Sequence, residues 1–369
     1  MKKLEPMKIL EIFLSSIGLI LSIILIVMLY NLNILPEKYT LSIIIILLVL
    51  NALGNFFMVN EKTKLKIIGY VILGLVIILD TVGNYYIKTT DKFLNKSFKK
   101  IETKEELKDI YNIYIGGVDF TDEIYDFNTI LSFNEAKENL LLVSIPRGYH
   151  IEAVGYDITD NLSYIGIKGI DVAIKSLEKL LDTKIDYYVK INTKSLVALV
   201  DLLGGIEYCS DTSYTTTHAM VLDTYDDTKG QKLYVEKGCK TYNGIQILTI
   251  ARERLNLIGG DIKRQENCQK ILISLIDKIM SFNTLANYEE ILDKVDALYE
   301  TNIPRELVTK LIKKKLDNKL NFNIETVNLT GHDQMGYVRL GTIYDYIVEP
   351  DMNTVEQAKI KLNENLTKK

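Results

Sequence analysis

The sequence contains few arginines, and most of them are clustered. Six of the 44 basic residues are arginine, and Arg252, Arg254 and Arg264 all fall within IARERLNLIGGDIKR (250–264). A fourth, Arg147, follows the proline that ends the apolar run LLLVSIP. A guanidinium group is always charged and its planar fork can bind two phosphate or carboxylate oxygens at once, whereas the ammonium group of lysine is a point charge. In a chain that otherwise uses lysine, these four arginines predict a bound anion.

The spacing of the arginines allows a common ligand only if a helix ends among them. On a regular helix Arg252 and Arg254 would point about 200° apart, but the following LNLIGG can end the helix. The next helix would begin at GGD, where free amide groups and the helix dipole favour a phosphate, with Arg264 about one turn further on. The alternative is a set of ordinary surface ion pairs, for example with Glu253 or Glu266.

A group of carboxylates follows a predicted strand. Asp119 comes directly after YNIYIGGV, and Asp122, Glu123 and Asp126 follow closely. The end of a strand is a usual position for a metal-binding or catalytic carboxylate, and a hard cation such as Mg²⁺ prefers oxygen ligands. Together with the arginines, the group suggests metal-assisted phosphoryl transfer. A solvated acidic loop is the alternative.

Other kinds of chemistry fit the sequence less well. His150, His218 and His332 lack metal-ligand spacing, and neither a GxSxG elbow nor a Walker loop is present. The net charge is −4, like charges do not form blocks, and aromatic residues are not interleaved with basic ones. We therefore expect no nucleic-acid partner.

Three apolar segments near the amino terminus, at residues 12–30, 41–59 and 67–87, place the predicted site relative to a membrane. Each has about 20 residues, enough for a helix to cross a hydrocarbon core about 30 Å thick. Three in succession fit neither buried core helices nor a cleavable signal peptide. We predict a three-helix membrane anchor at residues 1–87, followed by a linker at residues 88–107.

The distribution of lysines predicts the orientation of this anchor. Lysines precede the first segment and separate the second from the third, whereas the loop between the first two carries a single lysine. The positive-inside rule then places the amino terminus in the cytoplasm and the chain after residue 87 outside. We predict a multi-pass protein of the cell membrane with an extracellular carboxy-terminal domain. The lysines that predict this orientation are Lys2, Lys3, Lys8, Lys62, Lys64 and Lys66.

Asp80 lies inside the third segment. We expect it to pair with a neighbouring helix or to be solvated.

The remaining chain alternates strand-like and helix-like segments. NTILSFN and LLLVSIP are typical of strands, and GIDVAIKSLEKLLD places apolar residues at helical spacing. Interleaved strands and helices favour an α/β domain with helices covering a mixed sheet. We assign residues 108–366 to one such domain. Its carboxy-terminal part, residues 285–366, adds a predicted helix near 286–299, a proline-started helix, further strands and a last helix.

The sequence has three cysteines, so at least one is unpaired within the chain. Cys209 ends the strand-like GIEYC, and Cys239 lies in the turn-like EKGCKTYNG. We predict a disulfide between these two. Cys268 lies in a predicted helix without an adjacent histidine, and we expect it to be a packed thiol.

Several segments together resemble the LytR-CpsA-Psr (LCP) family, and most closely its capsule-type members with three membrane helices. They are the three apolar segments, LLLVSIPRGYHI, KIDYYVKINTKSLVALVDLLGGIE and TIARERLNLIGGDIKRQENCQKIL. The resemblance implies an α/β/α sandwich that holds a lipid tail in a hydrophobic groove. It also implies a Mg²⁺-dependent wall-assembly transferase of Gram-positive bacteria. Such enzymes move a glycopolymer, such as capsule polysaccharide or teichoic acid, from an undecaprenyl-pyrophosphate carrier to peptidoglycan through a phosphodiester.

The resemblance also assigns roles to particular residues. Arg147, Arg252, Arg254 and Arg264 match the arginines that bind the pyrophosphate in the family. Gln269 lies in the segment where the family has a paired glutamine. The first three of these arginines are also predicted to act in catalysis, by polarising the pyrophosphate.

The predicted metal site departs from the family pattern. Asp119 matches the first magnesium aspartate and is also a predicted catalytic residue. Where the family usually has Arg-Ser-Asp-Thr, this chain has Asp126, Phe127, Asn128 and Thr129. Asn128 would therefore be the second magnesium ligand, contributing an amide oxygen without charge. We expect a weakened or rearranged metal site, unless Asp122 or Asp126 substitutes.

Two hypotheses follow from these residues. The first is an active LCP-type phosphotransferase. The second is a catalytically weak or inactive relative that binds polyprenyl phosphate and acts as a scaffold or regulator of cell-wall assembly. The substitutions at Asp126 and Asn128 are the features that separate the two hypotheses.

Overall fold

A computed structural model describes residues 6–98, 108–222, 230–279, 299–317, 322–339 and 341–367. The chain divides into two units. A membrane unit consists of residues 1–101 and 304–320, and a sheet unit consists of residues 102–303 and 321–369. The chain therefore passes between the two units three times.

The membrane unit contains three long apolar helices. They are long and apolar enough to cross a membrane, as predicted. The third continues to Ser97, so the predicted start of the linker at residue 88 is too early. The helix continues because Ile87, Thr90 and Leu94 recur at helical spacing and are buried. The helices are α1 (Pro6–Leu32), α2 (Glu37–Met58) and α3 (Thr63–Ser97).

A buried polar cluster joins these three helices. The Ser22 hydroxyl donates to Asp80 over 2.5 Å, and the Asn51 side chain donates to the Ser22 hydroxyl over 2.9 Å. All three side chains are buried, and each comes from a different helix. Polar groups in an apolar bundle need partners within the protein, so this cluster helps to fix how the helices pack. Asp80 is thus a helix-pairing residue.

A fourth helix of the membrane unit, α11 (Arg305–Leu316), comes from a distant part of the sequence. Arg305 forms an ion pair with Asp91 over 2.7 Å and donates a hydrogen bond to Asn95, both on α3. Near the other end of α11, Asp317 pairs with Lys38 over 2.5 Å. The assignment of all of residues 108–366 to one domain is therefore corrected. These contacts join residues more than two hundred positions apart, so local sequence patterns do not reveal them.

The sheet unit is built on a mixed sheet with the order β11-β6-β1-β2-β3-β12. β1 pairs antiparallel with β2 and parallel with β6, and β12 pairs parallel with β3. β3 is a continuous apolar run because it is buried on both faces. The strands are β1 (Ile110–Val118), β2 (Tyr125–Asn134), β3 (Asn139–Ile145), β6 (Tyr187–Asn192), β11 (Tyr299–Thr301) and β12 (Asn323–Asn328).

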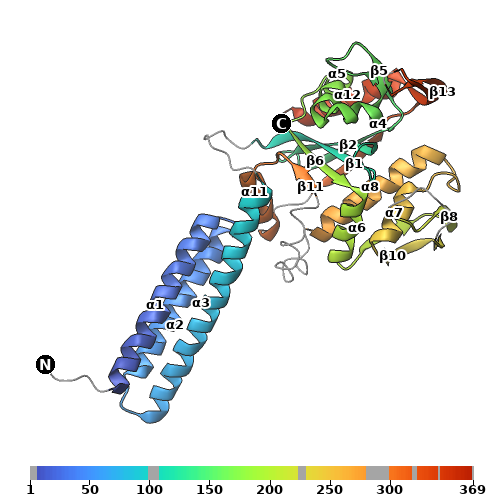
Figure 1. Ribbon diagram of the computed structural model, residues 1–369. Coiled ribbons are helices and arrows are strands. Elements are labelled where there is room, and N and C mark those ends of the chain that lie inside the picture. The colour runs from blue at the N-terminus through green and yellow to red at the C-terminus, as the bar shows by residue number, and fades with distance from the viewer. Residues whose placement is uncertain are drawn as a thin grey trace. The chain divides into compact units, whose positions relative to one another are not determined.

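Helices cover both faces of this sheet, which confirms the predicted α/β/α sandwich (Figure 1). One face packs on α4 (Leu162–Ile165), α5 (Ile170–Leu181) and α12 (Met352–Leu366), with Ile130, Leu177 and Leu362 among the core residues. The other face carries α6 (Thr193–Leu202), α7 (Gly244–Arg252) and α8 (Gly260–Ile279). The predicted helix near 286–299 lies outside the described residues, apart from Tyr299, which begins β11.

Each helix on the second face starts at a polar side chain or a glycine. The Asn192 side chain accepts a hydrogen bond from the Ser195 amide at the start of α6. Asn243 and Gln246 form a capping box at the start of α7. A Cβ atom on Gly244 would lie 2.2 Å from the Val197 carbonyl oxygen, so only glycine allows α7 to approach α6 this closely.

Among the described residues, four two-stranded sheets lie outside the main sheet. β13 and β14 form a long antiparallel hairpin, and β8 and β9 lie near α7 (Figure 1). Val348 of β14 also bridges to Tyr149, just after β3. The pairs are β4 (His150–Glu152) with β5 (Thr159–Asn161), β7 (Ile206–Ser210) with β10 (Gly238–Tyr242), β8 (Tyr214–Ala219) with β9 (Lys232–Val235), and β13 (Gly331–Val338) with β14 (Ile343–Pro350).

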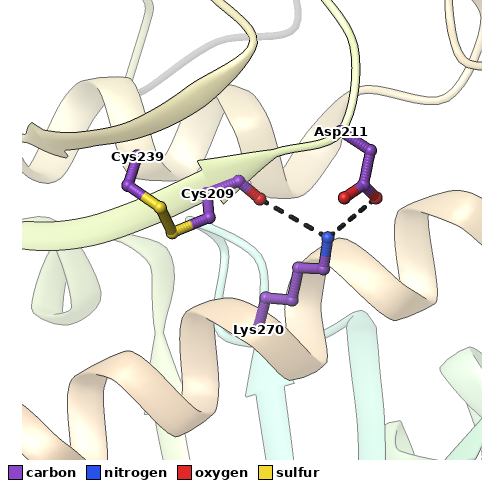
Figure 2. Close-up of a disulfide and its surroundings, with 4 residues drawn as sticks. All are labelled: Cys209, Asp211, Cys239 and Lys270. Carbon is purple, nitrogen blue, oxygen red and sulfur yellow. Dashed lines mark hydrogen bonds and ion pairs between the residues drawn. A yellow bond between two sulfur atoms is a disulfide. The ribbon is translucent and has the colours of Figure 1, made fainter.

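The β7–β10 pair is closed by a disulfide between Cys209 and Cys239, as predicted. Figure 2 shows Lys270 of α8 donating to the Cys209 carbonyl oxygen over 3.4 Å and pairing with Asp211 over 2.9 Å. Lys263 and Lys270 lower the pKa of Asp211 to about 2, so this carboxylate is charged at neutral pH. The disulfide joins β7 to β10, and the contacts of Lys263 and Lys270 attach this pair to α8.

Removing this disulfide should destabilise the sheet unit. The disulfide joins cysteines that are 30 positions apart in the sequence. Closing a loop of that length contributes about 3–4 kcal/mol to the free energy of unfolding. We expect Cys209→Ser/Cys239→Ser to lose about that amount, measured by urea unfolding of the full-length protein in detergent. Cys268→Ser, which removes the free thiol, is the control, and an equal loss in that variant would contradict the prediction.

Candidate functional site

A cavity of about 280 Å³ opens between the sheet and helices α6, α7 and α8. Apolar side chains cover most of its wall. Arg147, Arg252, Arg254 and Arg264 all line it, so the four arginines grouped from the sequence lie around one space. Their predicted role as pyrophosphate ligands remains a prediction. The apolar lining includes Ile115, Val118, Phe127, Ile191, Leu196, Leu248, Ile271, Leu272 and Leu275.

The local structure explains why the arginines converge. Arg252 is the last residue of α7, Arg254 lies in the loop that follows, and Arg264 lies in the second turn of α8. Gly259 and Gly260 both have positive φ, at 102° and 54°, which starts α8 in a new direction. Because the helix ends at Arg252, the divergence expected on a continuous helix does not arise.

Glu253, between the two arginines, organises this loop. It is fully buried, and its Oε1 accepts hydrogen bonds from the amides of Arg254 and Asn256, each over 3.0 Å. Its carboxylate also accepts from the amide and hydroxyl of Thr217 on β8. From the sequence, Glu253 was predicted only as a surface ion-pair partner, so this positioning role was missed. The only feature of the sequence that points to this role is the position of Glu253 between Arg252 and Arg254.

Glu266, the other proposed surface partner, pairs with Lys263 over 2.8 Å. Two carboxylates partly balance the positive charge of the cavity. Asp126 pairs with Arg147 over 2.5 Å, and Asp261 pairs with Arg264 over 2.9 Å.

Asp126 reaches the cavity because of an irregularity in the sheet. The register of β1 and β2 shifts so that Gly117 is opposite Phe127, while Val118 is opposite Tyr125. Asp126 is thus the extra residue of a β-bulge, and a bulge redirects side chains relative to the regular alternation. Among the described residues lining the cavity, Asp126 is the only carboxylate.

The predicted magnesium ligands do not meet at this cavity, and neither is among the residues that line it. Asn128 is buried, and its Oδ1 accepts from the Tyr114 hydroxyl over 2.6 Å, within the core that packs on α5 and α12. The Oδ1 of Asp119 accepts hydrogen bonds within its own turn, from the hydroxyl and amide of Thr121 and the amide of Ile124. As placed here, the Oδ1 atom of each residue accepts hydrogen bonds from other protein groups. Magnesium dependence remains a prediction based on the resemblance.

Gln269 also lies away from the cavity wall. Its amide group donates to Ser144 over 2.9 Å and to Asn328 over 3.0 Å, so it ties α8 to the ends of β3 and β12. It is buried in this position. Gln269 therefore positions the helix that carries Arg264, and direct pyrophosphate binding by Gln269 remains untested.

Cys268 lines the cavity but is a poor nucleophile. Burial raises the pKa of its thiol to about 11, and the nearby Arg264 only partly opposes this effect. Because the thiolate is the reactive form, the side chain is unreactive at neutral pH. It serves as an apolar part of the cavity wall.

The cavity and its arginines lie within a region that matches a known family. The sequence model of the LytR_cpsA_psr family matches residues 79–361 of this chain. The chain belongs to this family. The match covers every residue that lines the cavity, the last part of α3, and the sheet unit up to residue 361 within α12. The family membership therefore rests on the elements that build the site.

Several proteins similar to this chain are named as teichoic acid transferases. The chain is 25% identical to the polyisoprenyl-teichoic acid–peptidoglycan teichoic acid transferase TagU of Enterococcus faecalis, over 81% of this chain and 97% of the relative. It is also similar in fold to the crystal structure of Bacillus subtilis TagV, with a TM-score of 0.57 and 23% identity over 70% of this chain and 98% of that one. A structure described as TagT bound to LI-WTA matches with a TM-score of 0.54 and 22% identity, over 73% and 96% of the two chains.

Substituting Glu253 should test its role in holding the arginine loop. Glu253→Ala leaves buried amides of the loop without their acceptor, and we expect a loss of about 3 kcal/mol in the free energy of unfolding. Glu266→Ala removes a partly exposed ion pair at the start of α8 and should lose less than about 1 kcal/mol. Urea unfolding of the full-length protein measures both, and equal losses would argue against the proposed role.

Proposed function

We propose that this protein is a phosphotransferase that moves a glycopolymer from an undecaprenyl-pyrophosphate carrier onto peptidoglycan. The convergence of four arginines on a mostly apolar cavity carries this proposal. A long-chain lipid pyrophosphate combines an apolar tail with a doubly charged head, and the cavity offers a matching surface to each. The names of the relatives support the same donor and acceptor classes.

The arginines suit both binding and catalysis. Their planar forks can hold pyrophosphate oxygens in fixed positions and neutralise charge as it moves during the reaction. The acceptor hydroxyl oxygen forms a bond to the phosphorus that carries the glycan, and the bond from that phosphorus to the bridging oxygen breaks. The hydroxyl proton is lost, polyprenyl monophosphate leaves, and the glycan is joined to the acceptor by a phosphodiester.

Several features support a location of the sheet unit outside the cell membrane. The three apolar helices are long enough to cross the membrane. The Cys209–Cys239 disulfide is typical of an oxidising compartment. Lysines on the predicted cytoplasmic side give the same orientation by the positive-inside rule.

Replacing the guanidinium of Arg252 while keeping its charge should test the proposal. We expect Arg252→Lys to lower transfer by about 10–100-fold, because a charge-assisted forked contact is lost. The assay incubates the full-length protein with a short polyprenyl-pyrophosphate glycan and peptidoglycan fragments, and detects polyprenyl monophosphate and the glycan–acceptor product by mass spectrometry. Arg305→Lys makes the same change on α11, outside the cavity. It is the control and should keep the wild-type transfer rate.

Failure of the wild-type protein to form either product, with Mg²⁺ or another divalent cation present, would refute the enzyme assignment. Parallel reactions with EDTA test the predicted magnesium dependence.

The second hypothesis, a binding-only scaffold or regulator of cell-wall assembly, is favoured by one observation. Asp126 occupies a position where the family usually has arginine, and it pairs with Arg147 inside the cavity. This carboxylate offsets part of the charge available to a pyrophosphate. If the wild-type protein binds the lipid without turnover, and Asp126→Arg/Asn128→Asp transfers the glycan, the scaffold hypothesis is correct. Comparable turnover by both proteins would support the transferase.

A further inference from the structure

One face of the β13–β14 hairpin is an exposed aromatic surface. Tyr337 lies opposite Tyr344, and Met335 lies opposite Tyr346, so all four side chains share that face. Tyr337 and Tyr344 are 62% and 60% exposed, and their rings make an edge-to-face contact at 5.2 Å. An apolar patch of this kind on a polar domain commonly marks a binding surface.

The same face continues to the arginine end of the cavity. Val348, two residues beyond Tyr346, donates its amide hydrogen to the Gly148 carbonyl over 2.7 Å. Gly148 directly follows Arg147, which lines the cavity. A Cβ atom on Gly148 would lie 3.0 Å from a Val348 methyl group and 3.4 Å from the Tyr346 ring. The glycine therefore allows the tyrosine to pack directly beside the arginine position.

Charged residues at and near the cavity also act electrostatically on Tyr346 of this face. Burial is the main cause of the raised pKa of Tyr346, and its hydrogen bond to Asp333, over 2.7 Å, raises it further. Asp261 raises the same pKa and Arg254 lowers it, so Arg254 and the first turn of α8 are close enough to act on the phenol. Tyr346 is thus the side chain where the aromatic face and the arginine site meet.

The chemistry of the face suits a carbohydrate. A sugar ring has apolar C–H faces that stack on aromatic rings and hydroxyl groups that need polar partners. Tyrosine provides an apolar ring with a polar end. Asp333 shares the aromatic face, and its Oδ1 accepts from the Tyr346 hydroxyl. The face therefore combines stacking surfaces with a hydrogen-bonding carboxylate.

We propose that this hairpin face binds the first sugars of the donor glycopolymer, next to the pyrophosphate. This inference rests on the proposed function. With the lipid tail along the apolar lining and the pyrophosphate at the arginines, the attached glycan must leave the cavity at its arginine end. Tyr346 lies at that end, and Tyr337 and Tyr344 extend the aromatic face beyond it. The face thus contributes selectivity for a sugar-bearing pyrophosphate over the bare lipid.

Paired lipid probes test this assignment with the full-length protein in detergent. One probe is geranylgeranyl pyrophosphate, and the other is the same lipid carrying N-acetylglucosamine on its terminal phosphate. Wild-type protein should bind the sugar-bearing probe more tightly. Tyr337→Ala/Tyr344→Ala should weaken binding of that probe by about tenfold, from the loss of two stacking surfaces. Its affinity for the bare probe should be unchanged, which also shows that the variant is folded.

Two further variants serve as controls. Tyr337→Phe/Tyr344→Phe keeps the rings and should retain most of the selectivity. Tyr234→Ala removes a tyrosine of β9 that is 59% exposed and lies outside the hairpin, and it should bind both probes as wild type does. Arg252→Ala should lose both probes, because it removes a pyrophosphate contact.

The possible outcomes separate this inference from the proposed function. If wild type binds neither probe, both are overturned. If it binds both probes but the alanine pair leaves the affinity ratio unchanged, only the sugar assignment falls. If the pair instead raises KM for the peptidoglycan acceptor at unchanged donor affinity, the face belongs to the acceptor. Loss of self-association in the alanine pair, at an unchanged affinity ratio, would assign the face to a second copy of the chain.

Discussion

Four guanidinium groups around one small cavity repel one another, and much of the local structure offsets that repulsion. Asp126 and Asp261 each pair with one of the arginines. Glu253 accepts hydrogen bonds from the loop that carries Arg254. These carboxylates offset part of the positive charge of the wall. An anionic ligand would complete that balance, and its binding is the interaction on which the proposed chemistry depends.

The sheet separates this charged cavity from the main core. The side of the sheet that packs on α5 and α12 carries Tyr114, Asn128 and Ile130. There, apolar side chains enclose the hydrogen bond between the Tyr114 hydroxyl and Asn128. Ile115, Gly117 and Phe127 lie on the cavity side. Because successive side chains of a strand point to opposite faces, the β1–β2 pair contributes side chains both to the main core and to the cavity wall. The bulge at Asp126 interrupts this alternation, which is why a carboxylate reaches the cavity.

The membrane unit and the sheet unit are interleaved in sequence. The chain leaves the sheet after β11 at one edge, forms α11 within the membrane unit, and returns to β12 at the opposite edge. Arg305 and Asp317 fix the two ends of α11 to the membrane helices. The anchor is therefore more than an amino-terminal extension, since a segment from within the second half of the chain forms part of it.

Local sequence signals were enough to predict many elements of this protein. The apolar segments, the alternating strands and helices and the cysteine pair follow from composition and spacing, and the arginine cluster follows from its rarity in a lysine-rich chain. Family resemblance added the sandwich fold. Which side chains share a face or a cavity could be seen only after folding, because those relations depend on pairing between residues far apart in the chain. Asn128 faces the core because side chains alternate along β2, and there its Oδ1 accepts a hydrogen bond from the Tyr114 hydroxyl. Asp126 turned into the cavity because of a register shift. Glu253 proved to be buried, and α11 joined the membrane helices, through contacts between residues far apart in the chain.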